Sequence, residues 1–264
     1  LQRAIMSSSH GFWSLGGFAG AGIGGLMIER WGYVAHISAV TVFALLLVLL
    51  AMTFLVAENR PVISAGNGKR GLPRGTLVYI TGLIALFCMI PEGAVLDWAA
   101  LYLQQEMGAD YFTASLPFAA FAGVMAVMRF LGDGVRNRLG AVTTMRISAG
   151  VAAIGMLCAG FAPNAPVATL AFAFAGLGVA NMVPIVFSAA GNQPGISSAA
   201  GMSVATTMGY SGILFAPSLI GFVAEHTGFS PIFIGFAFVL GLVFMMADLV
   251  RPADQIAPQP APST

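Results

Sequence analysis

The chain has 264 residues, of which 58% are hydrophobic and only 8% are charged. A soluble domain is about 45–50% apolar and about 25% charged, so this composition excludes a water-soluble globule and indicates a membrane protein. Acidic and basic residues nearly cancel to a net charge of +1, which gives no sign of a nucleic-acid surface. Cys88 and Cys158 lie in apolar runs and are predicted to act as small hydrophobic residues, not as a disulfide.

The hydrocarbon core of a bilayer is crossed by about 20 apolar residues in a helix. Eight stretches meet this requirement, and each is predicted to be helical because backbone groups cannot stay unpaired in lipid. The predicted spans are 11–28, 33–56, 77–103, 112–132, 142–161, 164–189, 199–223 and 229–250. The fold class is therefore predicted to be all-α integral membrane, with eight transmembrane helices.

The basic residues predict the orientation, because cytoplasmic loops carry an excess of Lys and Arg. Ten of the eleven basic residues fall on one side of the predicted topology, which is therefore assigned to the cytoplasm, and only Arg30 falls on the other. The polar segment 57–76 is the predicted cytoplasmic linker. The Pro-rich tail 251–264 is predicted to be disordered. Both ends of the chain are then cytoplasmic.

An internal repeat relates the beginning of the chain to its end. Segment 14–32 aligns without a gap with segment 210–228, so that Gly32 matches Gly228 at an offset of 196 residues (228 − 32). The same offset carries the second span onto the last. If a complete unit has six helices, the first unit lacks four, and about 120 residues (196 − 75) are expected before Leu1.

The repeat divides the chain into parts of a twelve-helix protein, of which it would be the last eight helices. Residues 1–56 are predicted to form the last two helices of the N-terminal half, and residues 77–250 the complete six-helix C-terminal half. Two parallel six-helix repeats describe the halves of major facilitator transporters.

Further motifs carry the resemblance to the major facilitator superfamily. The loop 129–140 resembles the family's cytoplasmic signature of a glycine, an aspartate and an Arg-rich turn. The Gly-rich span after His10-Gly-Phe-Trp-Ser14, together with Glu92-Gly-Ala-Val-Leu-Asp97-Trp98, is similar to the MosC-like bacterial branch. The signature residues that carry over are Arg129, Gly132, Asp133, Arg136 and Arg138.

The resemblance implies a multi-pass protein of the bacterial inner membrane in which the first and fourth helices of each half line a cavity and the third and sixth face lipid. It also implies a small-molecule solute, and no obligate protein partner. The residues agree with this layout, since spans 33–56, 142–161 and 229–250 are almost free of polar side chains. Asp133 is interpreted as a gating latch facing a helix N-terminus, with the arginines at the cytoplasmic surface.

Glu92 is the most informative polar residue. It follows Pro91 in the middle of the span 77–103. A carboxylate in that position costs from about 2.5 kcal/mol upward and therefore usually faces a cavity and has a function. Without a partner it would exchange a proton in the physiological range, which makes it the proton-coupling candidate. The alternative is a carboxyl that only holds a neighbouring helix.

Three further residues are candidates for substrate binding. Asp97 lies about 140° around the helix from Glu92, so the two need not form a dyad; it could equally lie at the outer interface. Asn181 precedes Pro184, which leaves the carbonyl of residue 180 without its usual donor, for a ligand or for the Asn side chain. Tyr210 is a weaker candidate.

Other patterns favour packing over chemistry. The sequence Gly20-Ala-Gly22-Ile-Gly24-Gly25 satisfies a dinucleotide-binding pattern, but it lies inside an apolar membrane span. Gly16, Gly20 and Gly24 recur every four residues and are predicted to pack helices closely. The three histidines lack metal-ligand spacing, and neither a nucleotide nor another cofactor is expected.

The leading hypothesis is a secondary active transporter that works by rocking of two halves, with protons as the expected coupling ion and a small polar, sugar-like solute. A large anion is disfavoured because it would need intramembrane Arg or Lys. The alternatives are efflux of amphiphilic compounds by antiport and a membrane scaffold without transport. An enzyme is not expected, because clustered His, Asp or Ser residues near one interface are missing.

The predicted topology can be tested by labelling. A cysteine placed at Asn67 should react only from the cytoplasmic side and one at Asp110 only from the opposite side, because ten basic residues hold their loops in the cytoplasm. A membrane-impermeant maleimide applied to right-side-out and inverted vesicles measures this. Labelling of both positions from one side would refute the topology.

Overall fold

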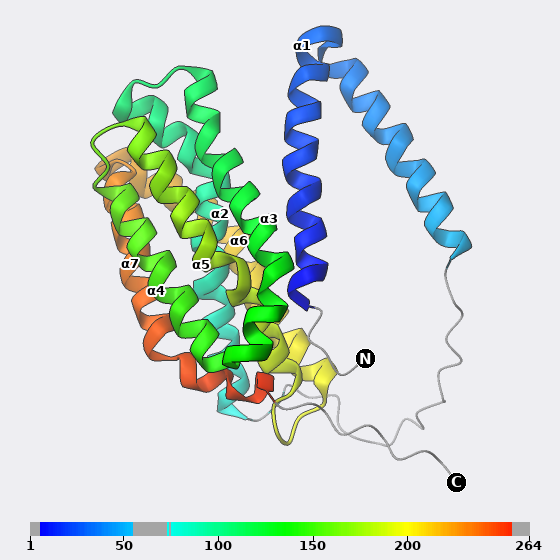
Figure 1. The fold of residues 1–264 in the computed structure, drawn as a ribbon, viewed down its shortest axis with the longest axis vertical. Coiled ribbons are helices and arrows are strands. Elements are labelled where there is room, and N and C mark those ends of the chain that lie inside the picture. The colour runs from blue at the N-terminus through cyan, green and yellow to red at the C-terminus, as the bar shows by residue number, and fades with distance from the viewer. Residues whose placement is uncertain (1–5, 55–72, 74, 255–264) are drawn as a thin grey trace. The chain divides into compact units, whose positions relative to one another are not determined.

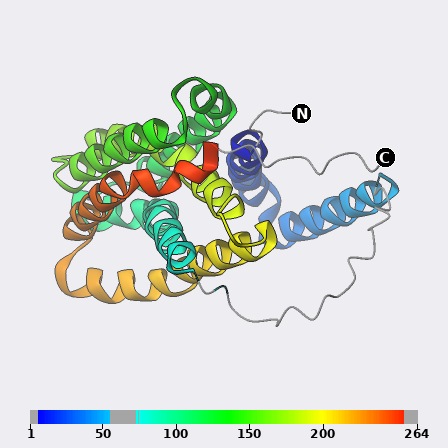
Figure 2. The same cartoon turned by 90° about the horizontal axis from the view of Figure 1, so that it is seen from below.

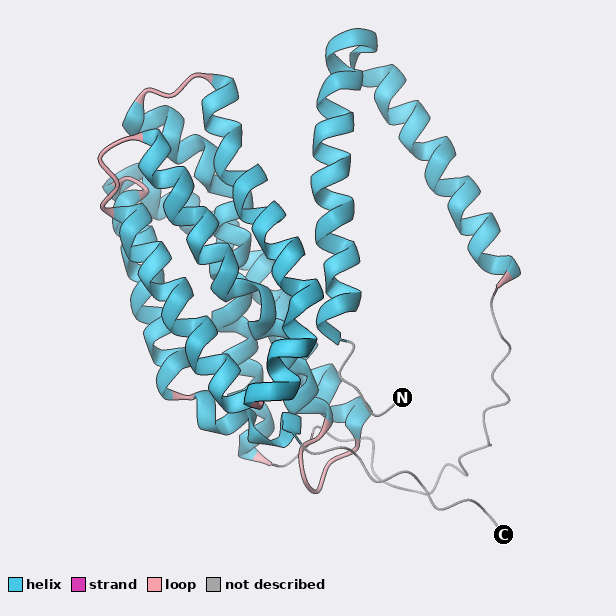
Figure 3. Ribbon diagram, viewed as in Figure 1, coloured by secondary structure: helices cyan, strands magenta, loops and turns pink. Residues whose placement is uncertain are grey.

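The structure is a computed structural model that describes residues 6–54, 73 and 75–254. Every regular element in these ranges is helical (Figure 3). The helices are α1 (Met6–Thr53), α2 (Thr76–Met107), α3 (Tyr111–Leu139), α4 (Ala141–Gly160), α5 (Ala165–Gly191), α6 (Ser198–Thr227) and α7 (Ser230–Met245), followed by the 3-10 segment η1 (Ala247–Asp254).

Seven stretches within the described ranges are long and apolar enough to cross a membrane. They correspond to the predicted spans from 33–56 onward, which confirms an all-α membrane fold. The first predicted span, 11–28, lies in α1, whose backbone is helical on both sides of a break at Gly32. Most of its side chains lie outside the described residues, so the eighth transmembrane helix stays a prediction.

Helices α2 to α7 form a bundle in which α5 is the most deeply buried element (Figures 1 and 2). Helix α2 packs against α6, α3 packs against α5, and α4 packs against both α5 and α7. An aromatic cluster joins three of these helices, since the ring of Phe233 lies 5.2 Å from that of Tyr102 and 4.8 Å from that of Phe172. The Tyr102 hydroxyl donates to the carbonyl of Ala159, 2.9 Å away, and so ties α2 to α4.

Three helix junctions share one backbone conformation. Gly32 breaks α1, Gly140 separates α3 from α4, and Gly228 ends α6, with φ of 78°, 79° and 79° and ψ of 165°, 164° and 176°. Positive φ favours glycine because other residues are strained there. The match of Gly32 with Gly228 supports the repeat at an offset of 196 residues. Gly140 takes the corresponding place after the second helix of the group α2–α4, as Gly228 does in α5–α7.

The segment η1 closes the end of the bundle where α3 meets α4. The Asp254 carboxylate accepts a hydrogen bond from the Ala141 backbone nitrogen at 2.7 Å and so caps α4. Asp248 forms an ion pair with Arg146. The prediction that the chain is disordered from residue 251 is therefore wrong for residues 251–254, because contacts distant in sequence hold them; residues 255–264 lie outside the described ranges.

The glycine junctions predict a stability difference. Gly140→Ala should destabilise the bundle by about 1–2 kcal/mol, because an L-residue is strained at this backbone conformation although space for its Cβ exists. Gly241→Ala is the matched control: Gly241 lies inside α7 with open space around a Cβ, so alanine there should be neutral or stabilising. Apparent melting temperatures in detergent measure the stability of both variants. Equal values would contradict the strain predicted for an L-residue at position 140.

Candidate functional site

The site begins at the middle of α2, where Glu92 follows Pro91 inside the helix. The Glu92 side chain is 16% exposed, and its Oε1 lies 2.9 Å from an Nη atom of Arg129 on α3. Arg129 is only 2% exposed. Glu92 therefore has a partner on a neighbouring helix, with which it forms an ion pair inside the membrane-spanning bundle, and its proton-coupling role stays a prediction.

Arg129 lies inside the bundle, and not at the cytoplasmic surface where it was predicted. It was expected at the cytoplasmic surface because the span around it was predicted to end at residue 132. The helix instead continues to Leu139, which places Arg129 ten residues, about 15 Å, from the helix end. The sequence feature that could have indicated the true end of this helix is Gly140, which follows Leu139 and adopts the positive φ that ends α3.

The backbone of α5 supplies a second partner for Arg129. Its Nε donates to the Ala180 carbonyl at 3.2 Å. This is the carbonyl that Pro184 was predicted to leave without its helical donor, and in the structure Arg129 is its donor, in place of the ligand or the Asn181 side chain that was expected. Arg129 therefore joins α2, α3 and α5 at one point.

Asn181 lies next to this point, at the contact between α3 and α5. It is 2% exposed, and its Oδ1 has no hydrogen-bond partner. A Cβ added to Gly132 would lie 1.8 Å from this oxygen, so the Hα of Gly132 points at it and makes a weak C–H···O contact. The structure thus places Asn181 and Gly132 together as a close helix contact, and substrate binding by Asn181 stays a prediction.

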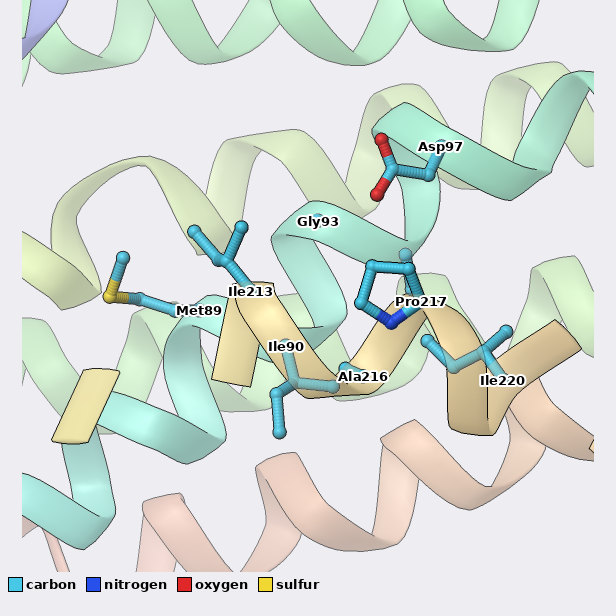
Figure 4. A pocket seen from close by; sticks show the side chains of 9 residues that line it. Met89, Ile90, Gly93, Asp97, Ile213, Ala216, Pro217 and Ile220 are labelled. Atoms are coloured by element: carbon cyan, nitrogen blue, oxygen red, sulfur yellow. The ribbon is translucent and has the colours of Figure 1, made fainter. Parts of the chain in front are cut away.

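Asp97 belongs to a different face of α2. It lines a cavity of about 10 Å³ between α2 and α6, with Ile213 and Pro217 on the opposite wall (Figure 4). This is room for about one water molecule. Glu92 does not line that cavity, in agreement with the prediction that the two acids need not form a dyad. Tyr210 is 53% exposed on α6, and Figure 4 does not include it among the residues around Asp97.

The remaining signature residues divide into buried and exposed positions. Asp133 and Arg136 are 7% and 8% exposed. Arg136 donates to the Ser188 hydroxyl at 2.9 Å and to the Ala253 carbonyl, so it holds α5 and η1 to α3. Arg138 is exposed. The expectation that all four charged signature residues lie at the surface is therefore wrong, and only Arg138 is fully open to the surroundings.

The glycine stripe in α1 is not tested by the structure. Gly16 has open space where a Cβ would lie, whereas the surroundings of Gly20 and Gly24 lie outside the described residues. Among the residues that the structure describes, three or more His, Cys, Asp or Glu side chains do not gather into a group that could hold a metal ion.

Comparison with known proteins decides the family. The sequence model of the Major Facilitator Superfamily matches residues 2–212. The chain belongs to this superfamily. Its members are transporters, not enzymes, and the chain is accordingly part of a multi-pass membrane protein. The helix bundle described above is thus a major facilitator fragment.

Three bacterial relatives are similar to most of the chain. An uncharacterized MFS-type transporter of Yersinia pestis is 33% identical over 88% of the chain, the membrane protein MosC of Rhizobium meliloti 31% over 85%, and the uncharacterized transporter y4wD of Sinorhizobium fredii 29% over 96%. The matched regions cover 60%, 54% and 66% of these relatives. The chain therefore spans between about half and two thirds of their length.

The contact between Gly132 and Asn181 gives a prediction that separates packing from other roles. Gly132→Ala should destabilise the bundle by about 1–3 kcal/mol, because the new methyl overlaps the Asn181 amide. The double variant Gly132→Ala/Asn181→Ala should recover much of this loss, since the amide is then gone.

Gly134→Ala is the control for helix propensity, because a Cβ at Gly134 meets open space. Apparent melting temperatures of the parent, Gly132→Ala, Asn181→Ala and the double variant form a double-mutant cycle. If Gly132→Ala were as stable as Gly134→Ala, the close contact would be refuted.

Proposed function

We propose that the complete transporter, this chain together with the residues that precede it, performs secondary active, proton-coupled transport of a small polar solute across the bacterial plasma membrane. The observation that carries the proposal is the Glu92–Arg129 ion pair at 2.9 Å inside the membrane-spanning bundle. Ionisable residues within membrane spans are costly, and they commonly mark ion and substrate pathways.

In the proposed mechanism Glu92 takes up the coupling proton. When Glu92 is ionised, the pair is neutral and holds α2 to α3. A proton on Glu92 removes the negative charge and leaves the Arg129 guanidinium without its counter-ion, so Arg129 becomes able to bind an acceptor oxygen of the solute. Release of the proton on the other side restores the pair, and the same exchange of partners serves import or export.

The solute class follows from the groups that face each other at this site. A large anion was disfavoured because no Arg or Lys was expected inside the membrane, but Arg129 lies there. Its guanidinium binds hydroxyl, carbonyl and carboxylate oxygens. A small polar solute with several oxygens, sugar-like or carrying a single carboxylate, therefore fits better than a purely apolar one.

Efflux of amphiphilic compounds by antiport is the second candidate. The observation in its favour is Asp97, a carboxylate beside the apolar side chains of Met89, Ile213 and Ile220; because the cavity there holds about one water molecule, an amphiphilic cation would bind only if α2 and α6 moved apart. Uptake of a labelled sugar and exclusion of a cationic dye, compared in cells with and without the protein, separate the two solute classes. A scaffold without transport would change neither.

Glu92→Gln tests the coupling role. Glutamine mimics the protonated acid permanently and still accepts a hydrogen bond from Arg129. Accumulation against a gradient, which requires the proton to leave, should fall to the background of empty liposomes. Exchange of solute for solute, which does not require deprotonation, should persist. Reconstituted proteoliposomes with an imposed pH gradient, and counterflow assays without one, measure the two activities.

Arg129→Gln is the contrasting variant. Like Glu92→Gln, it leaves one member of a buried pair without its counter-ion, which costs about 3–5 kcal/mol, so both single variants should express less than the parent and their activities are compared at equal amounts of reconstituted protein. The double variant Glu92→Gln/Arg129→Gln should regain expression and lose both activities. Uphill transport by Glu92→Gln at the parent rate would refute proton coupling at this residue.

A further inference from the structure

A cavity on the outside of the bundle is separate from the Glu92–Arg129 ion pair, although Asn181 belongs to its lining. It has a volume of about 210 Å³ and lies between α3, α4 and α5. Its lining runs along α3 from Met128 to Leu139 and along α4 from Thr144 to Ile147 and Val151. Leu139 and Ile147 are 47% and 53% exposed, so the cavity is open at the bundle surface.

The helices α3 and α4 that border this opening are both long and apolar enough to cross a membrane, so we expect the opening to face hydrocarbon. An apolar cavity of about 150 Å³ is already large enough to bind a benzene ring, and this one is larger. The twelve residues from Met128 to Leu139 rise about 16 Å along the helix axis, which is close to half of a hydrocarbon core about 30 Å thick. The cavity therefore has the length of an acyl chain in one leaflet.

The lining favours an acyl chain over a polar solute. None of the eleven lining residues is ionisable. The Thr144 hydroxyl donates to the Gly140 carbonyl at 2.7 Å, and the Asn181 Oδ1 is turned to Gly132. The polar residues of the lining are Thr144, Ser148 and Asn181, and the other eight are apolar or glycine, so what the cavity offers a ligand is mainly apolar surface.

A basic residue stands at one end of the cavity. Arg138 adjoins Leu139 in the last turn of α3 and is exposed. The neighbouring arginines are engaged, because Arg136 bonds Ser188 and Ala253 and Arg146 pairs with Asp248. Within the described part of the chain, Arg138 has no acidic partner. A cation at a membrane surface attracts anionic lipid headgroups.

We propose that this cavity binds one acyl chain of an anionic phospholipid whose headgroup lies at Arg138. The chain fills the space between α3 and α4 behind the Gly132–Asn181 contact, and the phosphate neutralises the exposed guanidinium. The bound lipid braces the side of α3 that faces away from α2, and it does so whether or not Glu92 is the coupling residue.

Lipid retention by the complete transporter tests the proposal. Native mass spectrometry from detergent micelles should show one retained phosphatidylglycerol, and less phosphatidylcholine with the same acyl chains. Arg138→Gln should weaken the binding of phosphatidylglycerol about fivefold, the factor that corresponds to about 1 kcal/mol per basic residue at the membrane surface. Val151→Trp, which fills the cavity, should lose retention of both lipids, because the acyl chain no longer contacts α3, α4 and α5.

Two matched controls exclude general effects. Arg251→Gln removes an exposed arginine that already pairs with Asp248, and Ile154→Trp adds the same bulk to an exposed position of α4 outside the cavity. Both should retain the lipid as the parent does. Ser148→Leu is a milder filling variant if Val151→Trp does not fold.

Three outcomes would overturn the proposal. One is unchanged retention by the folded filling variants. Another is an equal loss of phosphatidylglycerol retention in Arg138→Gln and Arg251→Gln. The third is displacement of the lipid by soluble glycerol phosphate, which would indicate a site for a free phosphate instead of a phospholipid.

Discussion

A full positive charge inside a membrane-spanning bundle is the constraint on which this structure depends. Arg129 is 2% exposed and always ionised, so its donors must find acceptors within the protein. Glu92 supplies a counter-charge from α2, and the Ala180 carbonyl supplies an acceptor from α5. The helices α2, α3 and α5 are therefore required to meet at one point, and the packing around it follows from that requirement.

Proline and glycine residues allow α2, α3 and α5 to meet at Arg129. Pro184 removes a helical hydrogen bond and frees the carbonyl that Arg129 uses. Gly132, one turn of α3 from Arg129, lets the Asn181 amide approach to where a Cβ would be. Gly140 ends the helix at a positive φ that other residues adopt with strain. Sequence features that weaken an isolated helix thus serve the contacts between helices.

These particulars explain what could be predicted from the sequence. Apolar runs gave the membrane spans, because length and hydropathy are local properties. The free carbonyl before Pro184 was predictable because it depends only on a residue four positions away. The ion pair was not predictable, because Glu92 and Arg129 are 37 residues apart and their contact depends on where α3 ends. The segment η1 was missed for a similar reason, since Asp254 caps a helix that begins 113 residues earlier.

The Glu92–Arg129 pair also changes the free-energy cost of protonating Glu92. A lone carboxylate in the membrane is most costly when ionised, so a proton by itself would relieve it. In the Glu92–Arg129 pair the two charges cancel when Glu92 is ionised, and protonation of Glu92 removes this counter-charge from Arg129. Under the proposed mechanism, a proton therefore binds favourably only when something else satisfies Arg129. Because linkage is reciprocal, a solute oxygen that binds Arg129 favours the proton, and the proton favours the solute. A buried pair couples two ligands, whereas a lone acid would bind only one.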